Sequence, residues 1–195
     1  MLKGFFIAVL SLYSFSMVAQ TYPMYVGTYT SNGSKGVYVY DFNEKNAATK
    51  FVKAIPLPNP SFLVRKDDIL YVVQEESKGA VTAYDLKKNQ VLNTLPTNGA
   101  HPCHVSVSPI DPLLVVSNYS GGSLVLYSTN KDGSLAKQED FLQFDRSSIN
   151  KERQQHSHIH SAFFSPDGKF VYVSDLGGDL IYKIAVEQEQ GAYKF

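Results

Sequence analysis

The sequence contains no tryptophan and a single cysteine, Cys103, among its 195 residues. One cysteine cannot form a disulfide within the chain, so the fold is not a disulfide scaffold. An excess of charge of either sign is missing too, because 18 Lys and Arg balance 18 Asp and Glu. Nucleic-acid-binding proteins usually carry a basic patch, so we expect no nucleic-acid partner and no affinity for an anionic membrane surface.

Helical patterning is also absent. No window of eleven or more residues places apolar side chains at helical spacing between convincing caps. The sequence is instead rich in aromatic residues, 13 Tyr and 12 Phe, which favour strands. The sequence also contains four dipeptides that tolerate positive φ and are typical of turns: Asn32-Gly33, Asn98-Gly99, Asp132-Gly133 and Asp167-Gly168. Because 44% of the residues are hydrophobic, the chain can build a core, and we expect an all-β protein.

Residues 1–20 read as a targeting segment rather than as part of the fold. Lys3 precedes an apolar run from Gly4 to Val18, and small or polar residues for cleavage follow at Ala19 and Gln20. The run is shorter than the roughly 20 residues of a comfortable membrane span. We therefore predict a secretory signal peptide at 1–20 and a domain at 21–195, which would be secreted or periplasmic and free of the membrane after cleavage. The alternative is a buried first strand.

A strand–turn–strand unit recurs along the chain. Gly36, Gly79 and Gly122 open the second strands of three units and lie 43 residues apart, and Gly178 follows after 56. The first and second strands are expected at 24–29 with 36–41, 70–74 with 79–85, 113–118 with 122–127 and 170–175 with 178–183. A period of about 43 residues built from strands is typical of β-propeller blades with four strands each.

A further strand precedes three of these hairpins, at 60–64, 102–107 and 159–164. Alignment of Ser108-Pro109 with Ser165-Pro166, a shift of 57 residues, places Cys103 opposite His160. These strands are candidates for the innermost position, where their starts would face a central channel. The longer third interval implies an insertion of about 13 residues within 145–157, which would project at one mouth of the channel, where loops form binding sites.

Four hairpins give about four blades, whereas propellers have roughly four to eight. A ring of four is conceivable, but we expect this chain to be the front part of a larger ring, because an open arc leaves strand edges and blade faces unburied.

The segment His-Ser-His-Ile-His-Ser at 156–161 concentrates three of the five histidines. On an extended strand, alternate side chains would share one face at a spacing of about 7 Å. Two of these imidazoles could share a zinc ion, but all three are spread too widely. No carboxylate or cysteine follows at ligand spacing, so we predict no metal and no cofactor.

Several motifs in the same order resemble the lactonase family of seven-bladed propellers. They lie at 25–30, 102–107, 117–123, 153–161 and 174–179, and the resemblance extends over 22–195. The best-known members of this family are 6-phosphogluconolactonases, and carboxy-cis,cis-muconate cyclases are relatives. The resemblance implies a ring of seven blades, of which this chain would hold about four. In the cyclases the proposed catalytic set is a histidine of this inner strand, which matches His160, with two arginines and a glutamate from later blades, beyond Phe195.

The resemblance implies that a sugar lactone is the small-molecule substrate. Lactone hydrolysis needs a group that activates water and donors that steady the developing oxyanion. Imidazole suits the first task because its ordinary pKa is near 6.5. We predict His160 as general acid or base, with a channel-lining histidine that only binds substrate as the alternative. Five residues are predicted to bind or position substrate: His158, His104, Arg153, Asn118 and Asp175. The competing interpretation is structural for His158 and His104 and a solvated loop charge for Arg153.

Two other kinds of function stay open at this point. One is a non-catalytic propeller that serves as a binding or interaction platform, and the other is a cycloisomerase of the muconate type. Serine-based acyl chemistry has no support, because the sequence lacks a Gly-x-Ser-x-Gly elbow. Cys103 is interpreted as a small buried side chain rather than a nucleophile, because no neighbour in the sequence would stabilise a thiolate.

Overall fold

The computed structural model describes residues 20–195, so the predicted signal peptide lies outside the described part except for Gln20. The described residues form antiparallel sheets, and their only helix is one 3-10 turn, η1 (Thr30–Asn32). The strands, in chain order, are β1 (Thr21–Val26), β2 (Val37–Asn43), β3 (Thr49–Ile55), β4 (Leu63–Lys66), β5 (Ile69–Gln74), β6 (Ala80–Asp85), β7 (Gln90–Pro96), β8 (Pro102–Val107), β9 (Leu113–Asn118), β10 (Ser123–Thr129), β11 (Leu135–Gln143), β12 (Ile159–Phe164), β13 (Phe170–Asp175), β14 (Leu180–Ala185), β15 (Glu187–Glu189) and β16 (Ala192–Lys194).

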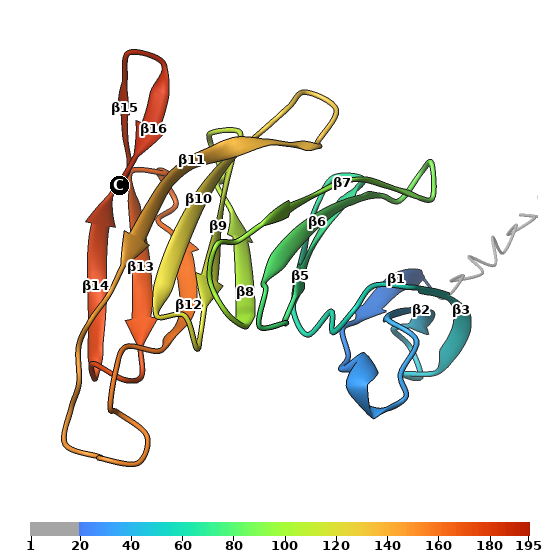
Figure 1. The fold of residues 1–195 in the computed structure, drawn as a ribbon. Helices are drawn as coiled ribbons and strands as arrows, with labels where there is room; N and C mark the ends of the chain where they lie inside the picture. The colour runs from blue at the N-terminus through green and yellow to red at the C-terminus, as the bar shows by residue number, and fades with distance from the viewer. Residues whose placement is uncertain (1–19) are drawn as a thin grey trace, which may run out of the picture.

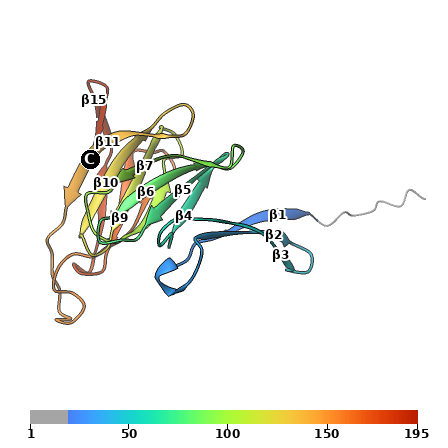
Figure 2. The same ribbon diagram turned by 45° about the vertical axis from the view of Figure 1, so that its right-hand side comes forward.

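The strands are arranged as four successive blades and a terminal hairpin. The first sheet has the order β1-β2-β3, the second β4-β5-β6-β7, the third β11-β10-β9-β8 and the fourth β12-β13-β14, while β15 pairs with β16. The second, third and fourth sheets stand side by side, and the first lies at one end of the row (Figures 1 and 2). The predicted all-β propeller architecture is therefore confirmed, with four blades in this chain.

All four predicted hairpins are present as antiparallel pairs: β1 with β2, β5 with β6, β9 with β10 and β13 with β14. Two strands start three residues from the predicted position, and the other predicted strands start within two residues of it. β1 covers Thr21–Val26 and not 24–29, because the amide of Thr28 leaves the ladder and donates to the carbonyl of Pro60 at 3.0 Å. β4 covers Leu63–Lys66 and not 60–64.

The repeat register in the fourth hairpin is also corrected. Asn118 pairs with Ser123 in the third sheet, and Asp175 pairs with Leu180 in the fourth, so the two hairpins superpose at a shift of 57 residues. The residue equivalent to Gly122 is then Asp179 and not Gly178. Both have a left-handed backbone, with φ of 58° and 56°. Aspartate tolerates this conformation better than most residues do, so it can replace glycine here. An alignment based on glycine positions therefore missed the equivalence of Gly122 and Asp179.

The core consists of three layers, each shared by two successive sheets. The layer between the second and third sheets includes Val73, Val116 and Tyr127, and the layer between the third and fourth includes Leu124, Ile159 and Val173. A third layer joins the first two sheets through Val37 and Leu70. This layering explains the continuous apolar runs of the middle strands, since a strand covered on both faces has no side for polar residues.

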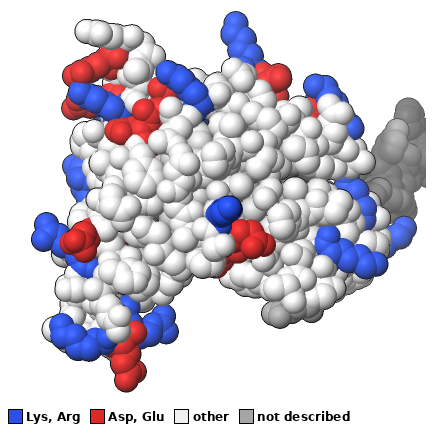
Figure 3. All heavy atoms as spheres, viewed as in Figure 1, with Lys and Arg blue, Asp and Glu red and all other residues white. Residues whose placement is uncertain are grey.

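The predicted inner strands β4, β8 and β12 are each at one edge of their sheet. β8 neighbours both of the others. The insertion predicted within 145–157 forms most of the long loop from β11 to β12, drawn in orange at the lower left of Figure 1. On the face drawn in Figure 3, charged side chains of both signs lie mainly around the periphery, and the described residues there form no stripe of one sign. Among residues 20–195, no helix has the length and apolar character that crossing a membrane would require.

Candidate functional site

Two equivalent β-bulges shape the site. The pairing of β8 with β9 shifts between Pro102 and His104, and that of β12 with β13 shifts between Ile159 and Ser161. The extra residues are Cys103 and His160, the pair that the sequence alignment had placed opposite each other. A bulge frees one residue from the ladder and can redirect its side chain. Both side chains line one small pocket.

The pocket has a volume of about 250 Å³ and collects residues from all four blades. Two repeated positions supply most of its wall. Cys103 and His160 are the bulge residues of the inner strands β8 and β12, and Ser61 lies just before the inner strand β4. Glu75 and Tyr119 follow the last residues of β5 and β9. Tyr29, after the first blade's β1, completes the lining. Residues far apart in sequence thus converge at the end of the inner strands, as expected for a propeller channel.

An aromatic cluster surrounds Tyr119. The His158 ring stacks on it, with centroids 4.5 Å apart and an interplanar angle of 16°, and the His160 ring meets its edge at 5.7 Å. The His156 ring also contacts the His158 ring, with centroids 4.3 Å apart. β12 begins at Ile159, so His156 and His158 precede the strand and the three imidazoles do not form the single strand face that was predicted.

His158 is held in place by the Asp175 carboxylate and the Tyr119 carbonyl. Its amide donates to Asp175 Oδ1 at 2.8 Å, and its Nδ1 lies 3.3 Å from the carbonyl oxygen of Tyr119. Burial lowers the pKa of His158, and the neighbouring His156 and Arg153 charges act in the same direction, while the Tyr119 carbonyl and Asp175 oppose them. His158 is therefore mostly neutral near pH 7.

Arg153 reaches the site from the insertion. Its side chain is exposed, and Nη2 donates to the hydroxyl oxygen of Tyr119 at 3.3 Å. The loop that carries it is ordered by Asn150, whose side-chain oxygen accepts from the Arg153 amide at 3.1 Å. The structure thus places the one predicted cation beside a pocket residue.

On the opposite side, Tyr29 donates its hydroxyl hydrogen to Glu75 Oε2 at 2.9 Å. Burial raises the pKa of Tyr29, and the hydrogen bond to Glu75 raises it further. Neither residue was predicted from the sequence. The 43-residue repeat places Glu75 opposite Asn118, and only the observed strand ends show that Glu75 follows β5 as Tyr119 follows β9.

His104 lies next to the pocket but does not line it. The residue is only 5% exposed, and its ring is packed between Phe62 and Phe163, with centroid separations of 4.5 and 4.6 Å. Its Nδ1 accepts from the Ala162 amide at 3.4 Å, which links β8 to β12. Burial, followed by the nearby His160, lowers the pKa of His104 to about 4. His104 is therefore a neutral link between two inner strands.

Asn118 and Asp175 end β9 and β13, as predicted, and both are buried. The Asn118 side-chain nitrogen donates to the Ser123 hydroxyl at 2.9 Å and to the Thr97 carbonyl at 3.3 Å, so its donors are used within the fold, while the buried Oδ1 accepts no hydrogen bond from the described residues. Asp175 accepts from the amides of His158 and Gly178 at 2.8 and 3.0 Å. Burial tends to raise the pKa of Asp175, but hydrogen bonds from Ser157, Gly178 and His158 outweigh it and hold the pKa below its usual value. Asp175 lines a second hollow of about 530 Å³, which it shares with His160.

The Cys103 thiol is poorly suited to nucleophilic attack. Burial, followed by the Glu75 carboxylate, raises its pKa to about 12. Because the thiolate is the nucleophile, this environment keeps the group unreactive near neutral pH. Within residues 20–195, no three His, Cys, Asp or Glu side chains are grouped as a metal site would need.

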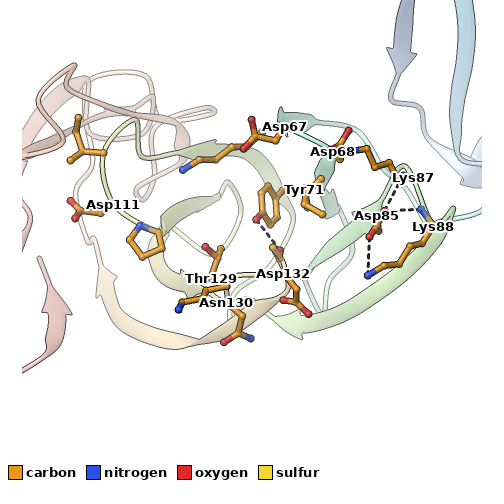
Figure 4. Close-up of a pocket in the computed structure, with 16 residues that line it drawn as sticks. Asp67, Asp68, Tyr71, Asp85, Lys87, Lys88, Asp111, Thr129, Asn130 and Asp132 are labelled. Carbon is orange, nitrogen blue, oxygen red and sulfur yellow. Dashed lines mark hydrogen bonds and ion pairs between the residues drawn. The ribbon is translucent and has the colours of Figure 1, made fainter.

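A larger hollow of about 520 Å³ lies at the other ends of β5 and β9, between the second and third blades (Figure 4). Several of its charged side chains are engaged within the hollow. Lys87 pairs with Asp68 at 2.6 Å, and Asp85 accepts the Lys88 amide at 2.8 Å. No histidine lines it, and we therefore assign the candidate active site to the smaller pocket around His160.

The chain matches known proteins in both sequence and structure. The family model described as "Lactonase, 7-bladed beta-propeller" matches residues 23–195. A 6-phosphogluconolactonase of Bacillus subtilis is 33% identical over 183 residues, covering 88% of this chain and 52% of the relative. A candidate 6-phosphogluconolactonase from Bacteroides fragilis has a solved structure that superposes with a TM-score of 0.80 at 38% identity, covering 86% of this chain and 49% of the other.

The periplasmic gluconolactonase of Pseudomonas aeruginosa superposes with a TM-score of 0.78 at 29% identity, covering 84% of this chain and 50% of the other. The chain thus spans about half the length of the relatives it matches. The family model matches nearly all described residues, and its description as a propeller agrees with the four blades. The chain therefore belongs to the lactonase family of seven-bladed β-propellers.

Proposed function

We propose that the protein containing this chain hydrolyses a sugar lactone at the His160 pocket. The observation that supports this most is the convergence of an exposed imidazole with hydroxyl, phenol and carboxylate groups from four blades in about 250 Å³. This volume lies below the range of about 300–1,000 Å³ that is common for drug-sized ligands, so the pocket suits a small molecule. The names of the relatives, 6-phosphogluconolactonase and gluconolactonase, support the same class of substrate.

In this proposal His160 acts as the general base and then as the acid. Its imidazole takes a proton from water while the water oxygen bonds to the lactone carbonyl carbon. When the tetrahedral intermediate collapses, the bond from that carbon to the ring oxygen breaks, and the proton passes to the ring oxygen. The product is an open-chain sugar acid.

The neighbouring residues would bind and position the substrate. Arg153 can pair with the developing oxyanion or the product carboxylate, because a guanidinium matches the geometry of a carboxylate. His158 supports Tyr119, and Asp175 fixes His158 through its amide. We propose that His104 and Asn118 do not contact the substrate and act by positioning the strands that carry the pocket residues. His104 holds β12 beside β8, and Asn118 fixes the end of β9 just before Tyr119.

The experiment compares His160→Gln with His156→Gln in protein expressed from the full reading frame. His156 is a matched control because it is exposed and two residues from His158, yet does not line the pocket. We expect His160→Gln to lower kcat for lactone hydrolysis by about 10²–10⁴-fold, the usual contribution of a general base, and His156→Gln to change it less than about threefold.

An equal loss of kcat in the His160→Gln and His156→Gln variants would show that His160 has no special role in the mechanism. Failure of the unmodified protein to turn over any sugar lactone would favour a binding platform. A change in muconate absorbance without lactone turnover would favour the cycloisomerase.

We further propose that residues 1–20 direct export, in keeping with the relative that is named periplasmic. Amino-terminal sequencing of the protein recovered outside the cytoplasm tests this. A start at Gln20 or Thr21 is expected, and an intact Met1 in the recovered protein would contradict it.

A further inference from the structure

The pocket around His160 has two chemically different sides. On one side lie His160 and Tyr119, and Arg153 donates to the Tyr119 hydroxyl there. On the other side lie Ser61, Tyr29 and Glu75, from the first and second blades. Arg153 and His160 suit the reacting carboxyl end of a lactone, so the hydroxyl-bearing remainder of the ring would face Glu75.

Glu75 is held in place yet keeps acceptor capacity. Its Oε2 accepts from Tyr29 at 2.9 Å, and no other side-chain hydrogen bond or ion pair to this carboxylate occurs among residues 20–195. An ionised carboxylate offers about four lone-pair sites, so most of them stay available to a ligand. The carboxylate also acts on the pocket interior, because it contributes to the raised pKa of Cys103.

The charge on this side is uncompensated in the described chain. No Lys or Arg is among the described residues that line the pocket. A carboxylate favours hydroxyl donors, which it binds through short charge-assisted hydrogen bonds, and it repels phosphate. A site built to hydrogen-bond a substrate hydroxyl also discriminates strongly against groups that cannot donate.

We propose that Glu75, positioned by Tyr29, is a specificity-determining residue that binds sugar hydroxyls and selects a neutral lactone over its phosphorylated form. The inference rests on the proposed function, because it places the lactone ring in the same pocket. It concerns the sugar hydroxyl end of the substrate and leaves the role of His160 unchanged.

The test measures kcat/KM for glucono-δ-lactone and for its 6-phosphate in the full-length protein and three variants. The unmodified protein should prefer the neutral lactone by at least about tenfold. Glu75→Gln should reduce this preference by about tenfold or more, because it removes the negative charge and weakens the hydroxyl contacts. Tyr29→Phe should change it in the same direction by a few fold.

Glu76→Gln is the matched control. Glu76 is the next residue, does not line the pocket, and accepts from the Asn59 side chain at 2.6 Å, a contact that glutamine can keep. The Glu76→Gln variant should prefer the neutral lactone as strongly as the unmodified protein does. This result would show that the loss of preference in Glu75→Gln comes from the pocket carboxylate and not from a general loss of negative charge.

Two results would overturn the inference while leaving lactone hydrolysis in place. One is an unmodified protein that prefers the phosphorylated lactone, and the other is a preference that Glu75→Gln does not alter. If no lactone is turned over, the proposed function fails, and calorimetric binding of the non-hydrolysable glucono-δ-lactam becomes the readout. Lactam binding that Glu75→Gln weakens about tenfold would uphold the role of Glu75, and absent or unchanged binding would reject it.

Discussion

The third and fourth blades repeat the same unit at a shift of 57 residues, yet they are buried to different extents. Every residue of β9 is buried, whereas exposure alternates along the equivalent β13. In the neighbouring strands, Leu124 is 0% exposed and its equivalent, Ile181, is 76% exposed. The third blade lies between two others, while among the described residues only the third blade covers the fourth. Strand pairing is thus a property of the repeat, and burial is a property of its neighbours.

The same comparison at the pocket end gives a functional lesson. Cys103 and His160 occupy equivalent bulges, and Asn118 and Asp175 occupy equivalent strand ends. The backbone geometry is shared, but one bulge presents a thiol whose pKa is raised to about 12 and the other an exposed imidazole. The difference in chemistry comes from side-chain identity on a common frame.

The largest expected difference concerns stability. Leu124→Ala should lower the free energy of unfolding by about 2–5 kcal/mol, because it leaves a cavity between the third and fourth sheets. Ile181→Ala should cost less than about 1 kcal/mol, because its side chain is mostly in solvent. Denaturant unfolding of the two variants checks this. A similar loss in both would show that the far face of the fourth sheet is covered in solution.

Asp175→Asn gives the fourth blade the residue type that Asn118 has in the third blade, and its expected effect is intermediate. It should lower the free energy of unfolding by about 1–3 kcal/mol at pH 7, because hydrogen bonds to a charged acceptor are weakened. Hydrogen bonds hold the folded-state pKa of Asp175 below its ordinary value, so the contribution is present above about pH 4 and is lost as the pH falls through the folded-state pKa.

The gap in unfolding free energy between the unmodified protein and Asp175→Asn should therefore shrink from pH 5 to pH 2. Asp179→Asn is the control, since it makes the same change at an exposed site. A gap that stays constant over this range would contradict the prediction.

The smallest expected difference tests the corrected register. Gly122→Ala should lower the unfolding free energy by more than about 1 kcal/mol, because φ is 58° and the new Cβ would lie 2.8 Å from the Ser157 carbonyl oxygen. Asp179→Gly should be neutral or stabilise by up to about 1 kcal/mol, because glycine adopts a φ of 56° without steric cost. Thermal unfolding of both variants measures this, and destabilisation by Asp179→Gly would argue against the shift of 57.

Part of the site could be predicted from the sequence. The alignment at a shift of 57 found the equivalence of Cys103 and His160, because Ser-Pro recurs after both inner strands. Glu75 was missed because no local motif marks it. Tyr29 lies within the motif at 25–30 but was given no role, because its contact with Glu75 joins two blades. The position of His104 was missed for a related reason: its aromatic neighbours, Phe62 and Phe163, belong to two other blades.

The sequence by itself determined the all-β character, the hairpin repeat and the positions of the inner strands β8 and β12, because alternation and turn residues act over a few residues of chain. The tertiary structure alone decided which repeated positions form the pocket and which are buried. Those properties depend on groups brought together from different blades, as when Glu75 meets Tyr29 and His160 meets Tyr119. Local patterns carry no information about such contacts until the blades are packed.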